Sequence, residues 1–375
     1  MSQTEVNYRN RQDRLAMAMK AANIEAMVLN AGPSLTYLSG LHFHLSERPV
    51  VGLFTPHLPP VIILPELEAG KLSNLPYQVK SFTYGEDPDT WQASFRDGVL
   101  AAELSDLRVG VEPRRLRVLE LKFLENADAG MKFVPGEACL AEIRMQKDEA
   151  EQAAMQKAVS TAQDALEATL PVIKPGITER ELAAELMVGL LREGSESQVP
   201  FAPIVASGPN SANPHAFPSD RRLERGDQLI IDWGANIGGY FSDLTRTFAI
   251  GEPPNEMKRI AQIVLQANEA AREMAGPGIP AQDVDRAARE VIEDAGYGEF
   301  FIHRTGHGLG MEVHEHPYIR EGNLLPLAPG MTFTIEPGIY LPGRGGVRIE
   351  DDVVITNDGI LSFSDMPRAL RTLGD

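Results

Sequence analysis

The sequence predicts a two-domain α/β protein, and three observations support this fold class. The chain has 375 residues, enough for two ordinary domains of roughly 150 residues each. In about the first 135 residues, short aliphatic runs alternate with helical patterns, as expected for a sheet with helices packed on it. In the rest of the chain one pattern of glycines, helices and strands occurs twice, which indicates a second α/β domain made of two related halves.

The N-terminal domain is expected to begin with a helix through Met19 and to continue with three strands. The strands correspond to Ala26-Met27-Val28-Leu29, Val50-Val51-Gly52-Leu53-Phe54 and Val61-Ile62-Ile63-Leu64, with a turn near Gly32-Pro33 and a further helix from Leu64-Pro65-Glu66. This part of the chain has no glycine-rich phosphate-binding fingerprint.

A break in the pattern at residues 133–136 marks the end of this domain. We therefore place the boundary near residue 136, which gives domains at 1–136 and 137–375. A long helical pattern from about Leu140 to Leu170 follows and predicts a single linker helix.

Composition excludes several classes of partner. The formal net charge of −18 disfavours nucleic acid and anionic membranes. The aliphatic runs are far shorter than the roughly 18 apolar residues that span a bilayer, so we interpret them as buried strands. The polar N-terminus has no secretory pattern, and the one cysteine, Cys139, has apolar neighbours typical of a buried structural thiol. Together these features favour a cytoplasmic protein with no nucleic-acid or membrane partner.

The internal repeat has an offset of about 102 residues. Pro175-Gly176-Ile177 recurs as Pro277-Gly278-Ile279, and each copy precedes a helical pattern that ends at a glycine, Gly194 or Gly296. Thr178 and Glu181 have the spacing of a capping box for the first of these helices. Ser207-Gly208 corresponds to Thr305-Gly306, and a carboxylate, Asp232 or Glu336, stands six residues after Gly226 or Gly330. The ordered matches predict a pseudo-twofold pair of halves with Asp232 and Glu336 opposite each other at the seam.

Four carboxylates in the two halves are candidate metal ligands. Asp232 and Glu336 each end a hydrophobic run, where a buried carboxylate is costly unless it is paired or bound to a cation. Asp232 and Asp243 flank the turn at Gly238-Gly239, and Glu336 and Glu350 flank a second glycine-rich turn at residues 343–346, so two hairpins bring the four acids together. Four clustered carboxylates would repel one another strongly unless divalent cations neutralised them.

The donor set predicts the number and kind of ions. Four carboxylates exceed the needs of one catalytic ion, so we expect two divalent ions. Oxygen ligands with one imidazole, His307, and no thiolate favour Mn²⁺, with Co²⁺, Zn²⁺ and Fe²⁺ as alternatives. Such a two-metal site activates water and polarises a carbonyl group at neutral pH.

Half of the eight histidines lie within 14 residues, at positions 303, 307, 314 and 316. The pair His303 and His307 has the i, i+4 spacing of a helical zinc motif, but no glutamate follows the first histidine. Gly306, Gly308 and Gly310 also argue against a helix and favour a strand or loop whose backbone closely approaches a ligand. We therefore expect a functional site beside these glycines.

Taken together, these motifs resemble those of the metal-dependent proline peptidases: prolidase, aminopeptidase P and, more distantly, methionine aminopeptidase. The resemblance extends over essentially the whole chain and rests on Asp232-Trp233-Gly234 with Ser242-Asp243-Leu244-Thr245-Arg246-Thr247, Thr305-Gly306-His307-Gly308-Leu309-Gly310, Val313-His314-Glu315, Thr334-Ile335-Glu336-Pro337-Gly338 and Val347-Arg348-Ile349-Glu350-Asp351. It implies a pita-bread C-terminal domain, an N-terminal domain like that of creatinase and prolidase, and a homodimer.

The resemblance also assigns roles to individual residues. It implies that Asp232 chelates one ion, that Asp243 and Glu350 bridge both, and that His307 and Glu336 complete the second. His215 matches a substrate-side histidine, His314 matches the histidine that stabilises the tetrahedral intermediate, and Arg348 matches the arginine two residues before the last ligand. Glu336 is in addition the candidate proton shuttle, and an ordinary ion pair to Asp351 or Asp352 is the alternative for Arg348.

One position departs from the family pattern. Prolidases commonly have an arginine directly after the proline of the His-Glu-X-Pro element, where it holds the carboxylate of the substrate, but Tyr318 follows Pro317 here. The nearest arginine along the chain is Arg320, which we expect to reach into the pocket as its replacement.

The resemblance implies a two-metal exopeptidase that hydrolyses Xaa-Pro bonds in di- or oligopeptides, with Xaa-Pro dipeptidase (prolidase) as the favoured activity. Aminopeptidase P, which acts on longer peptides, is the closest alternative, while the leading domain of about 135 residues disfavours methionine aminopeptidase. A metal-free creatinase-like hydrolase or a binding scaffold is disfavoured because all five ligand positions are filled.

Overall fold

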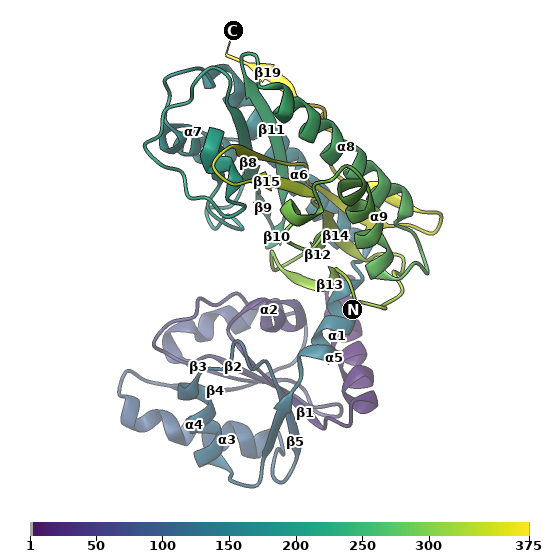
Figure 1. Ribbon diagram of the computed structural model, residues 1–375. Coiled ribbons are helices and arrows are strands. Elements are labelled where there is room, and N and C mark those ends of the chain that lie inside the picture. The colour runs from purple at the N-terminus through teal and green to yellow at the C-terminus, as the bar shows by residue number, and fades with distance from the viewer. Residues whose placement is uncertain (1–2, 375) are drawn as a thin grey trace. The chain divides into compact units, whose positions relative to one another are not determined.

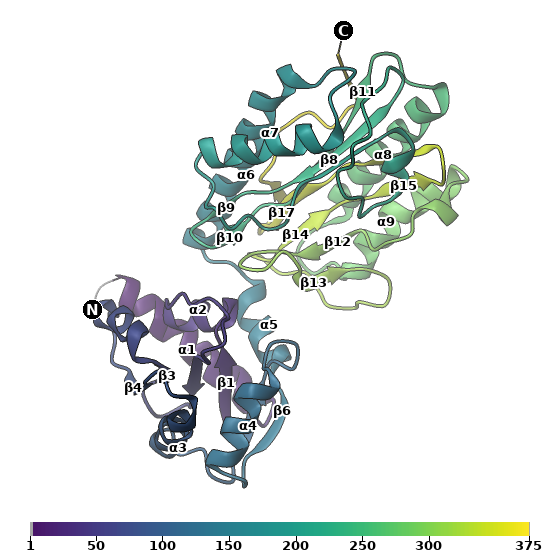
Figure 2. The same ribbon diagram turned by 90° about the vertical axis from the view of Figure 1, so that its left-hand side faces the viewer.

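The computed structural model describes residues 3–374. The chain divides into two compact units, the first ending at Arg144 and the second beginning at Met145 (Figures 1 and 2). The compact units therefore divide near the end of helix α5 (Glu137–Met145), whereas the sequence interpretation places the boundary before this helix, near residue 136. Within residues 3–374, no helix combines the length and the apolar composition needed to cross a membrane.

The N-terminal unit contains a six-stranded mixed sheet in the order β4-β3-β2-β1-β5-β6. The three strands expected from the sequence are present, and the predicted helix after the third is a 3₁₀ helix. Helices α3 and α4 contribute Phe95, Val99 and Leu124 to its core. The elements are α1 (Gln3–Ala21), β1 (Ala26–Asn30), α2 (Pro33–Ser39), β2 (Val51–Phe54), β3 (Val61–Pro65), η1 (Glu66–Asn74), β4 (Lys80–Tyr84), η2 (Pro88–Thr90), α3 (Trp91–Ala101), β5 (Arg108–Val111), α4 (Val118–Ala127), β6 (Lys132–Pro135) and α5 (Glu137–Met145).

The single linker helix expected from Leu140 to Leu170 is wrong. The structure has two helices here, α5 and α6 (Glu149–Thr169), separated at residues 146–148. Asp148 caps α6 in a capping box with Glu151, and the backbone N–H of Lys147 donates to the carbonyl of Gly330 instead of continuing a helix. The Asp-x-x-Glu spacing was therefore the sequence signal for this helix start.

The C-terminal unit is built from two similar halves, as the repeat predicts. The first half comprises α6, η3 (Leu170–Val172), α7 (Glu179–Arg192), β7 (Ile204–Ser207), η4 (Gly208–Ala212), β8 (Gln228–Trp233), β9 (Asn236–Ile237), β10 (Tyr240–Phe241) and β11 (Leu244–Ile250). The second half comprises α8 (Asn255–Met274), α9 (Ala281–Asp294), η5 (Gly298–Phe300), β12 (Gly306–Gly308), β13 (Glu315–Ile319), β14 (Thr332–Ile335), β15 (Gly338–Leu341), β16 (Gly345–Arg348) and β17 (Asp351–Ile355). Two short strands, β18 (Ile360–Ser362) and β19 (Arg371–Leu373), follow.

The repeated glycines have equivalent conformations in the two halves. Gly176 and Gly278 have φ values of 97° and 83°, in the left-handed region that favours glycine. Their backbone N–H groups donate to the carbonyls of Leu223 and Leu327, respectively. The capping box of Thr178 with Glu181 is present at the start of α7, as predicted. The sequence repeat is therefore a structural repeat.

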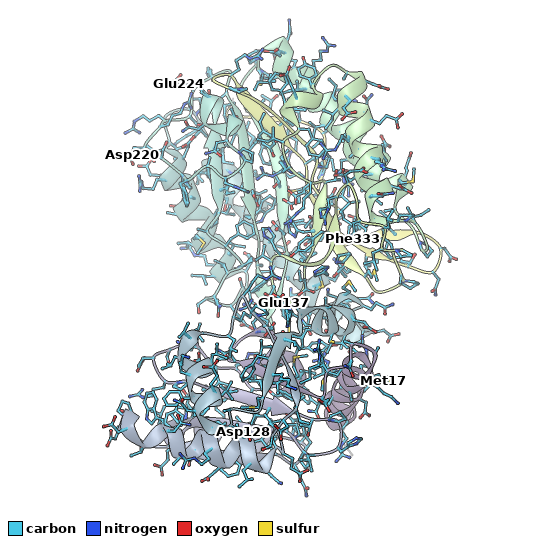
Figure 3. All side chains as sticks on the ribbon, turned by 60° about the horizontal axis from the view of Figure 1, so that its bottom comes forward. Met17, Asp128, Glu137, Asp220, Glu224 and Phe333 are labelled. Atoms are coloured by element: carbon cyan, nitrogen blue, oxygen red, sulfur yellow. The ribbon has the colours of Figure 1, made fainter. Side chains whose placement is uncertain are left out.

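Each half has its own sheet and its own hydrophobic core. The first sheet has the order β19-β11-β8-β7 and the second has the order β13-β12-β14-β17-β18. Helices α6 and α7 pack on the first sheet, and α8 and α9 on the second (Figure 2). Phe333 on β14 is fully buried in the second core, whereas Asp220 and Glu224 lie exposed on the first half (Figure 3).

The two sheets meet at one backbone bridge between Thr245 on β11 and Glu350, the residue before β17. The N–H of Glu350 donates to the carbonyl of Thr245 at 3.1 Å. This bridge brings the ends of β8 and β14 and the starts of β11 and β17 to the same place, which is where the sequence places its four acids.

Candidate active site

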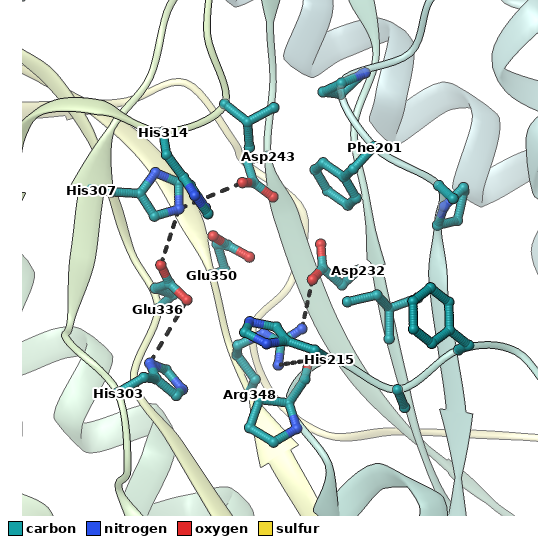
Figure 4. A pocket seen from close by; sticks show the side chains of 18 of the residues that line it. Phe201, His215, Asp232, Asp243, His303, His307, His314, Glu336, Arg348 and Glu350 are labelled. Carbon is teal, nitrogen blue, oxygen red and sulfur yellow. Dashed lines mark hydrogen bonds and ion pairs between the residues drawn. The ribbon is translucent and has the colours of Figure 1, made fainter. Parts of the chain in front are cut away.

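A pocket of about 680 Å³ lies between the two halves of the C-terminal unit (Figure 4). Residues from both sheets line it, so it lies at the predicted seam. The lining residues are Pro200, Phe201, Ala202, Pro203, Ile204, Pro214, His215, Ala216, Phe217, Pro218, Asp232, Asp243, His303, Arg304, His307, Val313, His314, Glu336, Arg348 and Glu350.

All five predicted metal ligands line this pocket. Asp232 is on β8, and Asp243 immediately precedes β11, while Glu336 and Glu350 occupy comparable positions around β14 and β17. His307 on β12 reaches the carboxylates from the side: its Nε2 lies 3.2 Å from Oε1 of Glu336 and 3.7 Å from Oδ2 of Asp243 (Figure 4). His307 is in the strand β12, so the histidine pair is not a helical zinc motif, as the glycines beside it predict.

Two threonines, each two positions along the chain from one of the acids, hold carboxylates of the cluster in place: Thr334 binds Glu336, and Thr245 binds Glu350 of the other half. Thr245 donates from Oγ1 to Oε2 of Glu350 at 2.7 Å, and Thr334 donates from Oγ1 to Oε1 of Glu336 at 3.2 Å. Neither threonine was identified from the sequence, although their i, i+2 spacing from Asp243 and Glu336 was the available signal.

Electrostatics favours a cation at this site. Burial raises the pKa of Asp243 and Glu350 well above the usual range, and neighbouring carboxylates raise both further. Burial also raises the pKa of Asp232, although the guanidinium of Arg348 opposes this effect. Burial would raise the pKa of Glu336 too, but its hydrogen bond to His307 and the charges of His307, His303 and Arg348 together outweigh burial and lower the pKa. A divalent ion would relieve the repulsion that the acids otherwise experience.

The residues present fit a metal ion. Ligand atoms of Asp243, His307 and Glu350 all lie within 4.8 Å of one another. In addition, Oδ1 of Asp232 is buried and has no hydrogen-bond partner among the described residues. An unsatisfied buried carboxylate oxygen beside a cluster of oxygen and imidazole donors is what an ion-binding site requires.

Arg348 forms an ion pair, but not with the residues named as its alternative partners. Its Nη2 donates to Oδ2 of Asp232 at 2.6 Å, its Nη1 to the hydroxyl of Tyr340 at 2.9 Å, and its Nε to Oγ1 of Thr245 at 3.0 Å. Asp351 instead pairs with Arg246 and Arg368. Arg348, on β16, thus fixes the candidate ligand Asp232, on β8.

The predicted substrate-side histidines also line the pocket. His215 is exposed on the loop after η4, and His314 lies in the segment before β13. The rings of His307 and His314 are 4.1 Å apart at 67° (Figure 4). Burial, followed by the charges of His307 and Arg304, lowers the pKa of His314 to about 4.

The structure does not bring Arg320 to the pocket, so the expectation that it reaches in is wrong. Arg320 follows β13, is exposed, and donates from Nη1 to the carbonyl of Glu321 at 2.9 Å. Sequence reasoning also missed a nearer cation, Arg304, because no motif distinguishes it from other arginines. His303 is a further unassigned lining residue, with Nε2 at 2.9 Å from the Tyr340 hydroxyl.

Comparisons with known proteins agree with this geometry. The model of metallopeptidase family M24 matches residues 153–357, and that of the creatinase/prolidase N-terminal domain matches residues 11–146. The protein named "Probable dipeptidase PepE" of Mycobacterium tuberculosis is 40% identical over 368 residues, covering 95% of this chain and 95% of that protein.

Two solved structures are similar over nearly the whole chain. A prolidase from Thermococcus sibiricus has a TM-score of 0.91 and 35% identity, covering 98% of this chain and 99% of that chain. The X-Pro aminopeptidase from Thermotoga maritima has a TM-score of 0.84 and 33% identity, covering 96% and 99%. The pita-bread domain and the creatinase-like N-terminal domain expected from the sequence are confirmed. This chain therefore belongs to metallopeptidase family M24 and carries the creatinase/prolidase N-terminal domain.

Proposed function

We propose that this chain is a metal-dependent Xaa-Pro dipeptidase whose active site is the pocket between the two halves of the C-terminal unit. The observation that carries the proposal is the buried cluster of Asp243, His307 and Glu350 at the base of a pocket that also contains His215 and His314. The likeness to a prolidase over almost the whole chain supports the choice of substrate.

We assign two divalent ions, with Mn²⁺ preferred, to Asp232, Asp243, His307, Glu336 and Glu350. When bound, the ions would supply an activated water molecule and polarise the carbonyl group of the bond to be cleaved. The cytoplasmic location and the homodimer stay predictions that rest on the sequence and on the family resemblance.

The side chains of the site have distinct tasks in this proposal. Glu336, whose lowered pKa keeps it ionised, accepts the proton released by the attacking water and passes it to the proline nitrogen. His314 donates a hydrogen bond to the oxygen on which negative charge develops. His215 contacts the substrate from the opposite wall, and Arg348 keeps Asp232 oriented.

Apolar residues complete the pocket. Phe201, Ile204 and Phe217 come from the first half and line the pocket. Phe217 is 87% exposed although it lines the pocket, so its ring is available to a bound peptide. Such a wall suits an apolar residue and helps exclude water from the ions.

Xaa-Pro aminopeptidase activity is the second candidate, because the Thermotoga maritima X-Pro aminopeptidase is similar over 96% of this chain. The test compares Mn²⁺-loaded protein on Ala-Pro, Ala-Pro-Ala and Ala-Ala. The dipeptidase proposal predicts a kcat/KM for Ala-Pro that exceeds that for Ala-Pro-Ala by roughly tenfold or more, with no cleavage of Ala-Ala. A clear preference for Ala-Pro-Ala would contradict the dipeptidase proposal and support Xaa-Pro aminopeptidase activity instead.

A further inference from the structure

A dipeptide substrate carries a free carboxylate next to the bond to be cleaved. In this pocket, which also contains four acidic side chains, such a charge is costly to bury unless a cation pairs with it. A longer peptide carries a neutral amide at the same position. The cation that meets the carboxylate would therefore decide how long a substrate the site prefers.

Two arginines line the pocket, and they differ in what they already bind. The guanidinium of Arg348 is fully engaged with Asp232, Tyr340 and Thr245. The guanidinium of Arg304 forms no ion pair or hydrogen bond with any residue in the described range 3–374, and the side chain is half-buried. Arg304 is thus the lining arginine whose donors are available to a ligand.

A neighbouring aromatic ring holds Arg304 in place. The guanidinium carbon lies 4.6 Å from the centre of the Tyr318 ring, within the range of a cation–π contact. Tyr318 is on β13 directly opposite His307 on β12, so the ring under Arg304 is fixed to the strand that carries a metal ligand. The imidazole of His316 packs against the Tyr318 ring, with the two ring centres 4.8 Å apart, and restrains that ring further.

This support has a chemical consequence. The five N–H donors of a guanidinium lie in the plane of the group. A guanidinium that lies over a ring therefore keeps these donors free to bind both oxygens of a carboxylate. The ring also limits the number of rotamers that the arginine loses on binding, which reduces the entropic cost of the contact.

We propose that Arg304, positioned by Tyr318, binds the C-terminal carboxylate of an Xaa-Pro dipeptide and so selects dipeptides over longer peptides. This inference rests on the proposed function and adds to it the residue that sets substrate length. A charge-assisted, bidentate contact of this kind contributes roughly ten- to a hundredfold to kcat/KM.

The test uses the Mn²⁺-loaded full chain and two substrates that differ only in the terminal charge, Ala-Pro and its amide, Ala-Pro-NH₂. In Arg304→Met, which keeps an unbranched side chain and removes the charge, the ratio of kcat/KM for Ala-Pro to that for Ala-Pro-NH₂ should fall roughly ten- to a hundredfold. The matched control is Arg259→Met: Arg259 also lies over a tyrosine, Tyr297, but is outside the pocket. It should keep the wild-type ratio.

If Tyr318 positions Arg304, changing its ring should affect the same ratio indirectly. Tyr318→Leu should lower the same ratio, and Tyr318→Phe, which retains the ring, should restore it. Metal content and thermal unfolding of each variant are measured alongside. Should Arg304→Met fail to fold, Arg304→Lys takes its place, and it should give an intermediate ratio because it keeps the charge and loses the planar fork.

The outcomes separate the two proposals. If wild-type protein cleaves Ala-Pro and the ratio is unchanged in Arg304→Met or Arg304→Lys, the role of Arg304 is wrong and the dipeptidase proposal stands. If wild-type protein cleaves no Xaa-Pro substrate, or prefers Ala-Pro-Ala to Ala-Pro, the proposed function itself fails.

Discussion

The two carboxylate oxygens of Asp232 differ in whether burial leaves them with a hydrogen-bond partner. Oδ2 accepts a hydrogen bond from Arg348, while Oδ1 is buried without a partner among the described residues. Asp243 and Glu350 lie close by with strongly raised pKa values, because burial and mutual repulsion both disfavour their charged forms. Burying these acids therefore lowers the free energy of unfolding of the metal-free protein, as expected for a site that is completed by cations.

Because the buried carboxylates repel one another, we predict that Asp243→Asn stabilises the metal-free protein. Removing one charge relieves repulsion and desolvation, so the free energy of unfolding in chelator should rise by about 1–3 kcal/mol. The stabilisation that Mn²⁺ gives to the wild-type protein should disappear, because a ligand is lost. Differential scanning calorimetry with chelator and with Mn²⁺ measures both effects. The control is Asp220→Asn, at an exposed position, and a lower Tm of Asp243→Asn in chelator would contradict this account of the cluster.

His314 is expected to act on the substrate and not on the ions. His314→Ala should lower kcat by roughly 10²–10³-fold, the usual effect of removing one donor to a developing negative charge, while bound metal stays the same. Steady-state kinetics and elemental analysis of the same preparation give the two numbers. Loss of metal together with activity would instead make His314 a ligand.

At the scale of elements, the approach of β12 to β14 depends on Gly306. A Cβ added there would lie 1.8 Å from the carbonyl oxygen of Thr334, closer than any real contact. Gly306 is adjacent to His307, so the close backbone approach and the position of the ligand are coupled. Glycine is required here by the neighbouring strand and not by its own backbone conformation.

Gly306→Ala is accordingly expected to separate β12 from β14. The free energy of unfolding should fall by about 1–3 kcal/mol or more, and metal affinity should fall with it because His307 moves. Urea denaturation and Mn²⁺ titration measure these changes. Gly70→Ala is the control, since a Cβ at Gly70 meets no atom within 4 Å. If Gly306→Ala binds Mn²⁺ as tightly as wild type, the strand contact does not position the ligand.

Helix α7 holds the loop that carries His215 through one buried carboxylate. Glu179 is fully buried and accepts hydrogen bonds from the backbone and hydroxyl groups of Ser207 and Ser219 and from the amide of Asn210. Burial would raise its pKa, but these hydrogen bonds outweigh burial and lower it. A lowered pKa in the folded state means that Glu179 stabilises the protein above its unfolded pKa, near 4.5, and that this contribution is lost as the pH falls through the folded pKa.

Glu179→Gln should therefore cost about 1–3 kcal/mol of unfolding free energy at pH 7, with a smaller difference from wild type at pH 4. Urea denaturation at the two pH values measures it. If the difference in unfolding free energy between wild type and Glu179→Gln is larger at pH 4 than at pH 7, the ionised Glu179 carboxylate does not have this stabilising role.

The sequence predicted the elements better than the contacts between them. The repeated glycines and the strand-ending acids predicted both halves and the four carboxylates that line the pocket, because they depend on local patterns with fixed spacing. The fifth candidate ligand, His307, came from the histidines beside the glycines and from the family resemblance. The break between α5 and α6 was missed although Asp148 and Glu151 carry its signal. Arg320 was expected in the pocket and Arg304 was not considered, because distance along the chain does not report which arginine lines a pocket formed by two separate halves.

For the whole molecule, the duplicated half-domain explains why the site lies where it does. Neither half alone contains the full set of candidate ligands: Asp232 and Asp243 come from the first half, and His307, Glu336 and Glu350 come from the second. The bridge between Thr245 and Glu350 joins the sheets at this point. Ion binding is consequently expected to stabilise the two halves of the C-terminal unit together.

The most direct test of the account is a titration of metal-free protein with Mn²⁺ that records bound ions per chain and the rate of Ala-Pro hydrolysis in parallel. We predict no measurable hydrolysis without metal and a rate that reaches its maximum when about two ions are bound per chain. Full activity in the metal-free protein, or no hydrolysis of Ala-Pro when the sites are saturated, would contradict the central claim that the two halves form a metal-dependent Xaa-Pro dipeptidase site.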